Sequence, residues 1–341
     1  MNFKKHIKEQ DFKNKIRNQI YKYSIYEGIY DVGSEESEDL RPDLKYYAFD
    51  WDDNLMYMPT KIMVMSENDD EIGMSTEDFA EHRHQIGVED FKYKGSTIVG
   101  YSPDPFIYFK EAGENKFLID SMIAPVGPAW NDFVECLNGG SLFAIITARG
   151  HSPQTLRKGI FNLIAKNHNG INKSEMIKNL KRYHEMISKT ENLKEDIDSK
   201  KFEADFNGSD LVLEYLDRCL MAPVTYGQGS AANPEEGKKV ALRKFISDCR
   251  QSAKELVQSL LDKNPNLKLS DLVPKFKNDV SFNEVMDDID IDEFITQNVK
   301  IGFSDDDLKN AEAQRDMLSQ EYPNEPINVY YTKGGEKRKF N

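Results

Sequence analysis

Two short acidic clusters are the residues of this sequence best suited to chemistry. Asp50 and Asp52 lie two residues apart in the stretch FDWDDN, and Asp305 and Asp306 are adjacent in FSDDD. A carboxylate is costly to remove from water unless it is paired or binds a cation. Two facing clusters would repel one another unless a cation lay between them. Oxygen ligands with open positions suit Mg²⁺, which shares the phosphate oxygens of a substrate. The clusters therefore predict a magnesium site for a phosphorylated ligand.

The spacing of the first cluster also suits phosphoryl transfer. One Asp carboxylate can attack a phosphoryl group when a divalent ion screens the negative charges. A second carboxylate two residues away can protonate the leaving group and later activate water. The reaction also needs groups that neutralise phosphate. Thr147 in IITARG offers a hydroxyl, and Lys238 and Lys239 in EEGKKVAL are two candidates for an ammonium group.

Each of these polar groups follows an apolar run or begins a helical pattern. Apolar runs predict strands at 46–50, 142–150, 218–226, 298–307 and 327–332. Helical periodicity predicts helices at about 128–138, 153–166, 172–190, 208–216, 235–262 and 306–320. This alternation indicates an α/β fold with a mostly parallel sheet covered on both faces. Such sheets bind ligands at the carboxyl ends of their strands, so the polar groups are expected to meet there.

Two spacers are too long to be simple crossovers between strands. Residues 56–127 predict a hairpin over 60–75 and then a short helix at EDFAEHRHQ. Residues 167–207 are rich in Lys, Glu and Asn, which predicts an exposed helical insertion or partial disorder. The core of the fold is therefore expected at 44–332, interrupted by these two insertions.

The ends of the chain carry charge rather than apolar runs. Residues 1–24 predict a basic amphipathic helix, and 33–43 an acidic linker, so that 1–43 stands apart from the core. The basic helix suits docking with a solvated face, or binding to a membrane or nucleic acid. Residues 333–341, KGGEKRKFN, predict a frayed basic tail.

Composition restricts the classes of protein that this sequence can represent. A chain of 341 residues can bury a sizeable core, and its net charge of −14 argues against general coating of DNA. Its three cysteines form no CxxC pair, which disfavours a zinc site or a disulfide framework. No apolar run approaches the roughly 18 residues of a membrane span. A secretory signal pattern is also missing, so a cytoplasmic protein is expected.

The order of these motifs resembles the haloacid dehalogenase (HAD) superfamily of phosphohydrolases. That family has a D-x-D after a strand, matched by FDWDDNL, and then a strand ending in Thr or Ser, matched by FAIITARG. Its third motif is a Lys at a helix start, matched by EGKKVAL, and its fourth is an acidic pair after a strand, matched by IGFSDDD. The matches span residues 46–310. The resemblance implies a three-layer Rossmann-like core with a flap and small cap at 56–127.

The resemblance also implies roles for the acidic residues. Asp50 would be the nucleophile that forms an aspartyl-phosphate, and Asp52 the general acid and base. Asp50, the backbone carbonyl of Asp52 and Asp305 would hold Mg²⁺, with Asp306 as a second acid nearby. The implied enzyme is a Mg²⁺-dependent phosphatase.

The remaining implied roles concern the substrate. Thr147 and Lys238, or Lys239 in its place, would bind the phosphoryl oxygens, and the hairpin at 60–75 would be the flap. A small phosphate monoester is the implied substrate. A nucleotide or nucleic-acid end is supported only by the basic terminal segments and the aromatic residues at 101–110. A non-catalytic binding protein of the same fold and a phosphotransferase or mutase are the alternatives, and the oligomeric state is left open.

Four features lie outside the family pattern or stay undecided. Asn54 stands where the family usually has Thr or Val, and its amide is expected to form local hydrogen bonds. The fourth motif is SDDDLKN rather than GD-x-x-x-D, so Asn310 would stand in for a later acid. Asp53 and Asp307 are expected as acids at helix starts. The residues 149–151, Arg-Gly-His, could touch substrate or cap the next helix.

Overall fold

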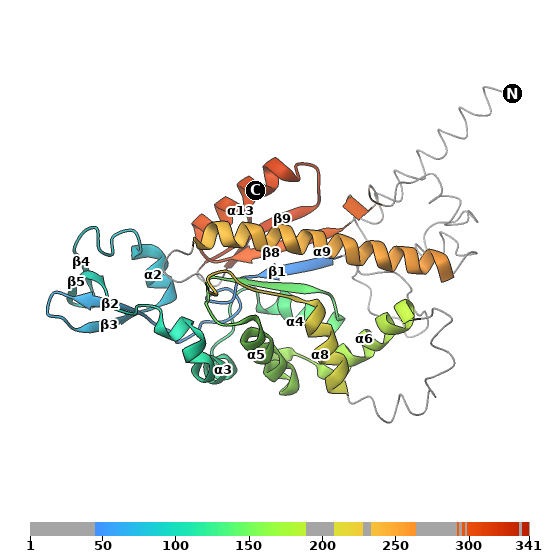
Figure 1. The fold of residues 1–341 in the computed structure, drawn as a ribbon, viewed down its shortest axis with the longest axis horizontal. Helices are drawn as coiled ribbons and strands as arrows, with labels where there is room; N and C mark the ends of the chain where they lie inside the picture. The colour runs from blue at the N-terminus through green and yellow to red at the C-terminus, as the bar shows by residue number, and fades with distance from the viewer. Residues whose placement is uncertain are drawn as a thin grey trace, which may run out of the picture.

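The computed structural model describes residues 45–188, 208–227, 233–263, 292, 295–296, 299–333 and 336–340. In these ranges six strands form one sheet in the order β10-β9-β8-β1-β6-β7, and four others form a separate sheet beyond one end of it (Figure 1). The strands of the main sheet are β1 (Lys45–Phe49), β6 (Phe143–Thr147), β7 (Leu220–Pro223), β8 (Lys300–Asp305), β9 (Ile327–Lys333) and β10 (Glu336–Phe340).

β1 lies at the point in the main sheet where the order of strand addition reverses. From β1 the chain passes to β6 and β7 on one side, and then crosses to β8 and β9 on the other. β1 is parallel to both neighbours, with Ala48 opposite Ala144 on β6 and Phe303 on β8. Ligands of open α/β sheets bind outside the carboxyl ends of the strands at such a switch point. The ends of β1 and β8 are therefore the expected place for a site.

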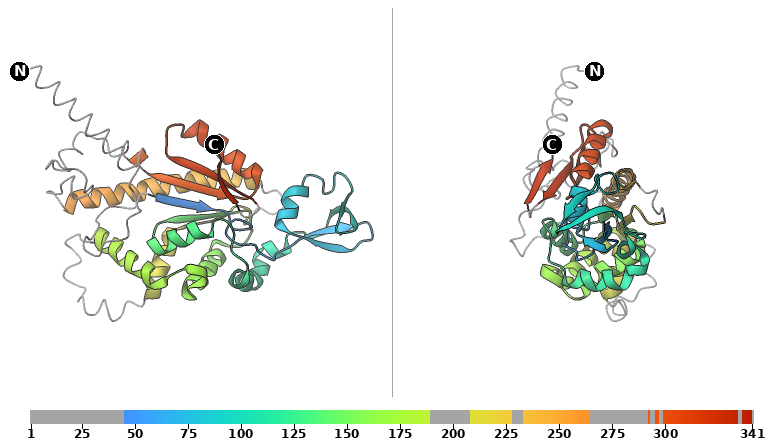
Figure 2. Two further views of the ribbon diagram at one scale, coloured as in Figure 1. Left: turned by 180° about the vertical axis from the view of Figure 1, so that it is seen from behind. Right: turned by 90° about the vertical axis from the view of Figure 1, so that its left-hand side faces the viewer.

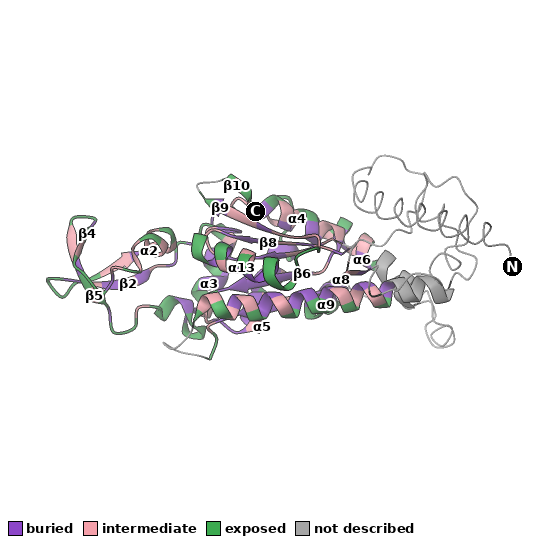
Figure 3. Ribbon diagram, turned by 90° about the horizontal axis from the view of Figure 1, so that it is seen from above, coloured by how far each residue is buried: buried purple, intermediate pink, exposed green. Residues whose placement is uncertain are grey.

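Helices cover both faces of the main sheet (Figures 1 and 3). One face carries α9 (Pro234–Lys263) and α13 (Leu308–Glu321). The other face carries α4 (Trp130–Gly139), α5 (Pro153–Ala165), α6 (Lys173–Ser188) and α8 (Gly208–Arg218). Every residue of β6 is buried, as expected for a strand covered on both sides. The predicted α/β class, with a mostly parallel sheet, is thus confirmed.

Residues 56–127 form an insertion, named the flap insertion here, whose part 62–101 projects past the end of the main sheet, while 114–123 pack against residues 153–165 (Figure 2). Its strands pair in the order β3-β2-β5-β4. Its elements are β2 (Ile62–Ser66), β3 (Glu71–Met74), α2 (Thr76–His82), β4 (Phe91–Tyr93), β5 (Ser96–Tyr101) and α3 (Glu114–Ile123). The predicted hairpin and short helix are both present. A small core that includes Val64, Met74 and Ile98 gives this sheet its own packing.

Two sequence predictions need correction. Residues 336–340 are not a frayed tail, because they form β10, which pairs antiparallel with β9. The described part of the 167–207 insertion is not an exposed hairpin, because Met176 and Leu180 of α6 are buried in the core beside α4. Residues 189–207 and the predicted basic helix and acidic linker of 1–43 lie outside the described residues. Within the described ranges, every helix is too short or too polar to span a bilayer.

Candidate active site

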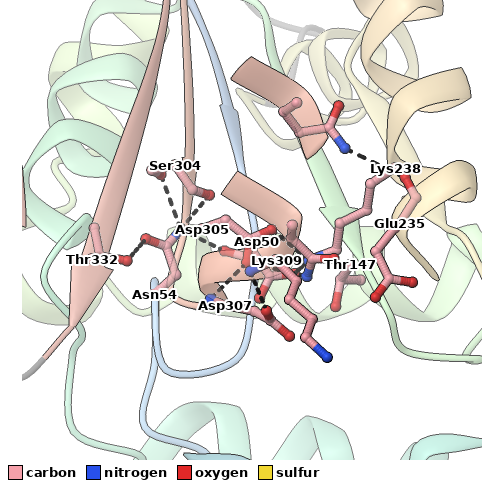
Figure 4. A network of polar contacts seen from close by, with 12 residues as sticks. Asp50, Asn54, Thr147, Glu235, Lys238, Ser304, Asp305, Asp307, Lys309 and Thr332 are labelled. Atoms are coloured by element: carbon pink, nitrogen blue, oxygen red, sulfur yellow. Dashed lines mark hydrogen bonds and ion pairs between the residues drawn. The ribbon is translucent and has the colours of Figure 1, made fainter. Parts of the chain in front are cut away.

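The predicted polar groups meet at the carboxyl ends of three neighbouring strands (Figure 4). Asp50 directly follows β1, Thr147 is the last residue of β6, and Asp305 is the last residue of β8. Lys238 reaches them from the start of α9, which begins at Pro234 as the sequence predicts. Asp50, Thr147, Lys238 and Asp305 are all buried.

Lys238 is the lysine that faces the acidic cluster. Its ammonium Nζ lies 2.9 Å from Asp50 Oδ1 and 2.6 Å from Asp305 Oδ2. Burial alone would lower the pKa of Lys238, but the carboxylates of Asp305 and Asp50 outweigh it and hold that pKa above its usual value. Lys239 instead pairs with Glu236 and lines a groove between α9 and α13. Of the two lysines, Lys238 is therefore the one that contacts the carboxylates, and its role in binding phosphate stays a prediction.

Three carboxylates form a compact oxygen-rich cluster. Asp50, Asp305 and Asp306 each place one oxygen within 4.8 Å of the others. Burial, only partly offset by Lys238, raises the pKa of Asp50 to about 8. Burial, together with Asp50 and Asp305, also raises the pKa of Asp306 well above its usual value. The cluster has three carboxyl groups and only one ammonium group, that of Lys238. Oxygen donors of this kind are ligands that fit Mg²⁺.

Asp52 lies beside this cluster but its carboxylate is engaged elsewhere. Its Oδ2 accepts a hydrogen bond from Arg149 Nε at 2.8 Å, and its Oδ1 accepts one from Arg149 Nη2 at 2.6 Å. The resemblance assigns the backbone carbonyl of Asp52, rather than this carboxylate, to a metal, and that role stays a prediction. Arg149 does not cap the following helix, because the N-cap of α5 is Ser152, which accepts from Thr155 N–H at 3.2 Å.

The hydroxyl of Thr147 is held at the end of β6. Thr147 is 1% exposed, and its Oγ1 accepts a hydrogen bond from the backbone N–H of Arg149 at 3.3 Å. A β-branched residue suits a strand because its χ1 is restricted there, and the hydrogen bond from Arg149 orients the hydroxyl. Thr147 ends β6, and Arg149 follows it in the turn after the strand, with both side chains buried.

Asn54 ties the loop after β1 to the neighbouring strands. Its amide nitrogen donates to Asp50 O at 3.0 Å, Ser304 O at 3.1 Å and Ser304 Oγ at 3.0 Å. Its Oδ1 accepts from Thr332 Oγ1 at 2.9 Å. The expectation of local hydrogen bonding is confirmed, and the bonds also reach β8 and β9. An amide can do this because it both donates and accepts, whereas the Val of the family pattern can do neither.

This network predicts a stability cost for the Asn54→Asp variant. The carboxylate would turn an oxygen toward the carbonyl oxygens of Asp50 and Ser304, which lose their shared donor. Unmade buried hydrogen bonds cost roughly 1–3 kcal/mol each, so the free energy of unfolding should fall by about 3 kcal/mol. Urea unfolding at neutral pH measures this. Asn68→Asp, at an exposed position of the β2–β3 turn, is the control, and equal midpoints for the two variants would contradict the prediction.

The two predicted helix-start acids have different outcomes. Asp307 is the N-cap of α13, where its side chain accepts from Lys309 N–H at 2.8 Å, as predicted. Asp53 lies instead in a turn with a left-handed φ of 53°, so its prediction is wrong. Burial raises the pKa of Asp53 to about 6, and the side chain of Thr76 on the flap partly offsets this.

An arginine that the sequence reasoning missed joins the flap to the core. Arg83 caps the C-terminal end of α2, and its guanidinium lies 3.1 Å from Glu235 Oε1 and 3.2 Å from Asp307 Oδ2. These two acids begin α9 and α13, the helices that border the acidic cluster. The flap helix is therefore held over the end of the main sheet that carries Asp50.

No family model, curated protein or solved structure matches this chain. The resemblance to the HAD superfamily thus stays a prediction that depends on four short motifs. What the structure adds is their arrangement, because motif residues up to 256 positions apart (Asp50 and Asp306) contribute to one cluster.

Proposed function

We propose that this protein is a Mg²⁺-dependent phosphohydrolase of the HAD type, which cleaves a phosphate monoester through an aspartyl-phosphate on Asp50. The observation that carries this proposal is the meeting of Asp50, Asp305 and Lys238 within hydrogen-bond distance at the switch point of the sheet. A buried nucleophile beside one fixed cation and two further carboxylates suits the transfer of a charged phosphoryl group.

The proposed reaction has two steps, both carried by residues of this site. In the first, an oxygen of Asp50 bonds to phosphorus while the ester P–O bond breaks, and the leaving oxygen takes a proton from Asp52. In the second, water bonds to phosphorus while the bond to Asp50 breaks, and Asp52 takes the proton from that water. Inorganic phosphate and the free Asp50 carboxylate are the products of the second step.

The charges of the site support the metal dependence. Asp50, Asp305, Asp306 and the backbone carbonyl of Asp52 would hold Mg²⁺, which supplies positive charge against the phosphoryl oxygens when bound. Lys238, near the start of α9, supplies a second positive charge. Thr147, buried at the end of β6, is the proposed hydroxyl donor to a phosphoryl oxygen.

Phosphate release from a panel of phosphate monoesters and phosphorylated oligonucleotide ends tests this function. Release is expected with MgCl₂ and is expected to stop when EDTA removes the metal. Mg²⁺ binding without any release would favour the non-catalytic alternative, in which Lys238 neutralises the carboxylates of a binding site. Transfer to an added alcohol in place of water would indicate a phosphotransferase.

A further inference from the structure

A buried arginine in the turn after β6, Arg149, contacts both Asp52 and the flap insertion. The side chain of Arg149 is 0% exposed. The carbon of its guanidinium lies 4.8 Å from the ring centre of Phe109 and 4.9 Å from that of Phe117. Rings at this distance attract the cation and restrict a planar guanidinium. Arg149 therefore has little freedom to move away from its partners.

Two of its nitrogens are committed to Asp52. Nε and Nη2 donate to the two carboxylate oxygens at 2.8 and 2.6 Å, which is the bidentate geometry that fixes a carboxylate both in place and in rotation. Each carboxylate oxygen has a second lone pair, so the pair with Arg149 leaves Asp52 able to exchange a proton with a substrate.

The same guanidinium also contacts both roots of the flap insertion. Nη2 donates to Oγ1 of Thr60, which lies just before β2, at 2.9 Å. Phe109 follows β5 at the other root, and its carbonyl accepts from Gly150 N–H at 2.9 Å. The side chain of Arg149 thus contacts the Asp52 carboxylate and both roots of the flap insertion.

We propose that Arg149 is a positioning residue, which aims Asp52 at the leaving-group oxygen and links that aim to the roots of the flap through Thr60. This inference rests on the proposed function. General acid catalysis requires the acid within hydrogen-bond distance of the atom that it protonates, and contributes typically 10²–10⁴-fold. If the Asp52 carboxylate were free to rotate, much of this rate enhancement would be lost.

The test compares phenyl phosphate with 4-nitrophenyl phosphate, which have similar size but leaving groups that differ in their need for a proton. Arg149→Lys keeps the positive charge and loses the bidentate geometry of the guanidinium. For this variant, kcat/KM for phenyl phosphate is expected to fall on the order of 10²-fold. For 4-nitrophenyl phosphate the loss is expected to be less than about tenfold, because its leaving group departs without help. Arg157→Lys, a partly exposed arginine of α5, is the matched control.

A double-mutant cycle separates positioning from general damage. If Arg149 acts through Asp52, adding Arg149→Lys to Asp52→Asn should cause little further loss. Equal losses on the two substrates, or additive losses in the cycle, would overturn the inference and leave the function standing. No release by the wild type would overturn both.

A second variant keeps the test decisive if Arg149→Lys does not fold. Thr60→Val removes only the hydroxyl that accepts from Arg149 and leaves both partners of the Arg149–Asp52 pair unchanged. It is expected to show the same preference for the activated substrate to a smaller degree. Activity unchanged, or reduced equally on both substrates, would show that the flap root does not bear on Asp52.

Discussion

The Asp50→Asn variant is expected to lose phosphate release by a factor on the order of 10⁴ or more, because an amide cannot form the aspartyl-phosphate intermediate. Asn keeps the size of Asp and can still accept a hydrogen bond from Lys238, so the fold should persist. Phosphate release with MgCl₂ measures the loss. The mass of the acid-quenched protein should rise by one phosphoryl group in the wild type and stay unchanged in the variant.

The control for this variant is Asp53→Asn, which changes the same atoms three positions along the chain. Asp53 has a left-handed φ, which Asn tolerates well, and it lies outside the acidic cluster. Its release should stay close to that of the wild type. Retention of metal-dependent release by Asp50→Asn would rule out Asp50 as the nucleophile.

The Lys238→Met variant is expected to show the largest change in stability. Without its ammonium, the buried carboxylates of Asp50 and Asp305 lose the cation they share. Breaking a buried pair from one side typically costs 3–5 kcal/mol, so a loss on the order of 3 kcal/mol or more is expected at neutral pH in EDTA. Added MgCl₂ should restore stability to this variant more than to the wild type, because an ion binding the cluster replaces the missing charge.

Lys239→Met is the matched control, since it alters the adjacent lysine, which pairs with Glu236 at the surface. Urea unfolding with EDTA and with MgCl₂ gives both comparisons. If the two variants unfold at the same urea concentration, the buried ion pairs contribute nothing to stability. If MgCl₂ stabilises neither Lys238→Met nor the wild type, the three carboxylates do not form a metal site.

Much of the fold follows from local patterns in the sequence. The strands and helices of the core were predictable because each has the apolar periodicity of its type. The choice between the two lysines was also within reach of the sequence. Lys238 lies four and seven residues before Leu242 and Phe245, which are buried against the sheet. Helical spacing therefore places Lys238, and not Lys239, on the inward face of α9.

Other parts depend on contacts between segments far apart in the chain. Arg149 and Asp52 are separated by 97 positions, and each lies on a loop, so no periodicity relates them. The contact of Arg83 with the helix starts likewise depends on how the flap insertion sits on the core. β10 was missed because its charged residues show no apolar alternation, and its pairing with β9 is made by the backbone. For Arg149, a charged residue next to a fully buried strand was a signal, since such a cation needs a partner.

In the part of the chain that the structure describes, the two outer strands of the main sheet, β7 and β10, bear on edge-to-edge association. An outer strand exposes unpaired backbone groups that can template the addition of a strand from another molecule. At one edge, β7 has four residues and ends at Pro223, which has no N–H to donate. At the other, β10 carries Lys337, Arg338 and Lys339 in succession, so a second copy would bring like charges together. The short length and the proline of β7 disfavour pairing at one edge of the sheet. Repulsion between the basic side chains of two β10 strands disfavours pairing at the other edge.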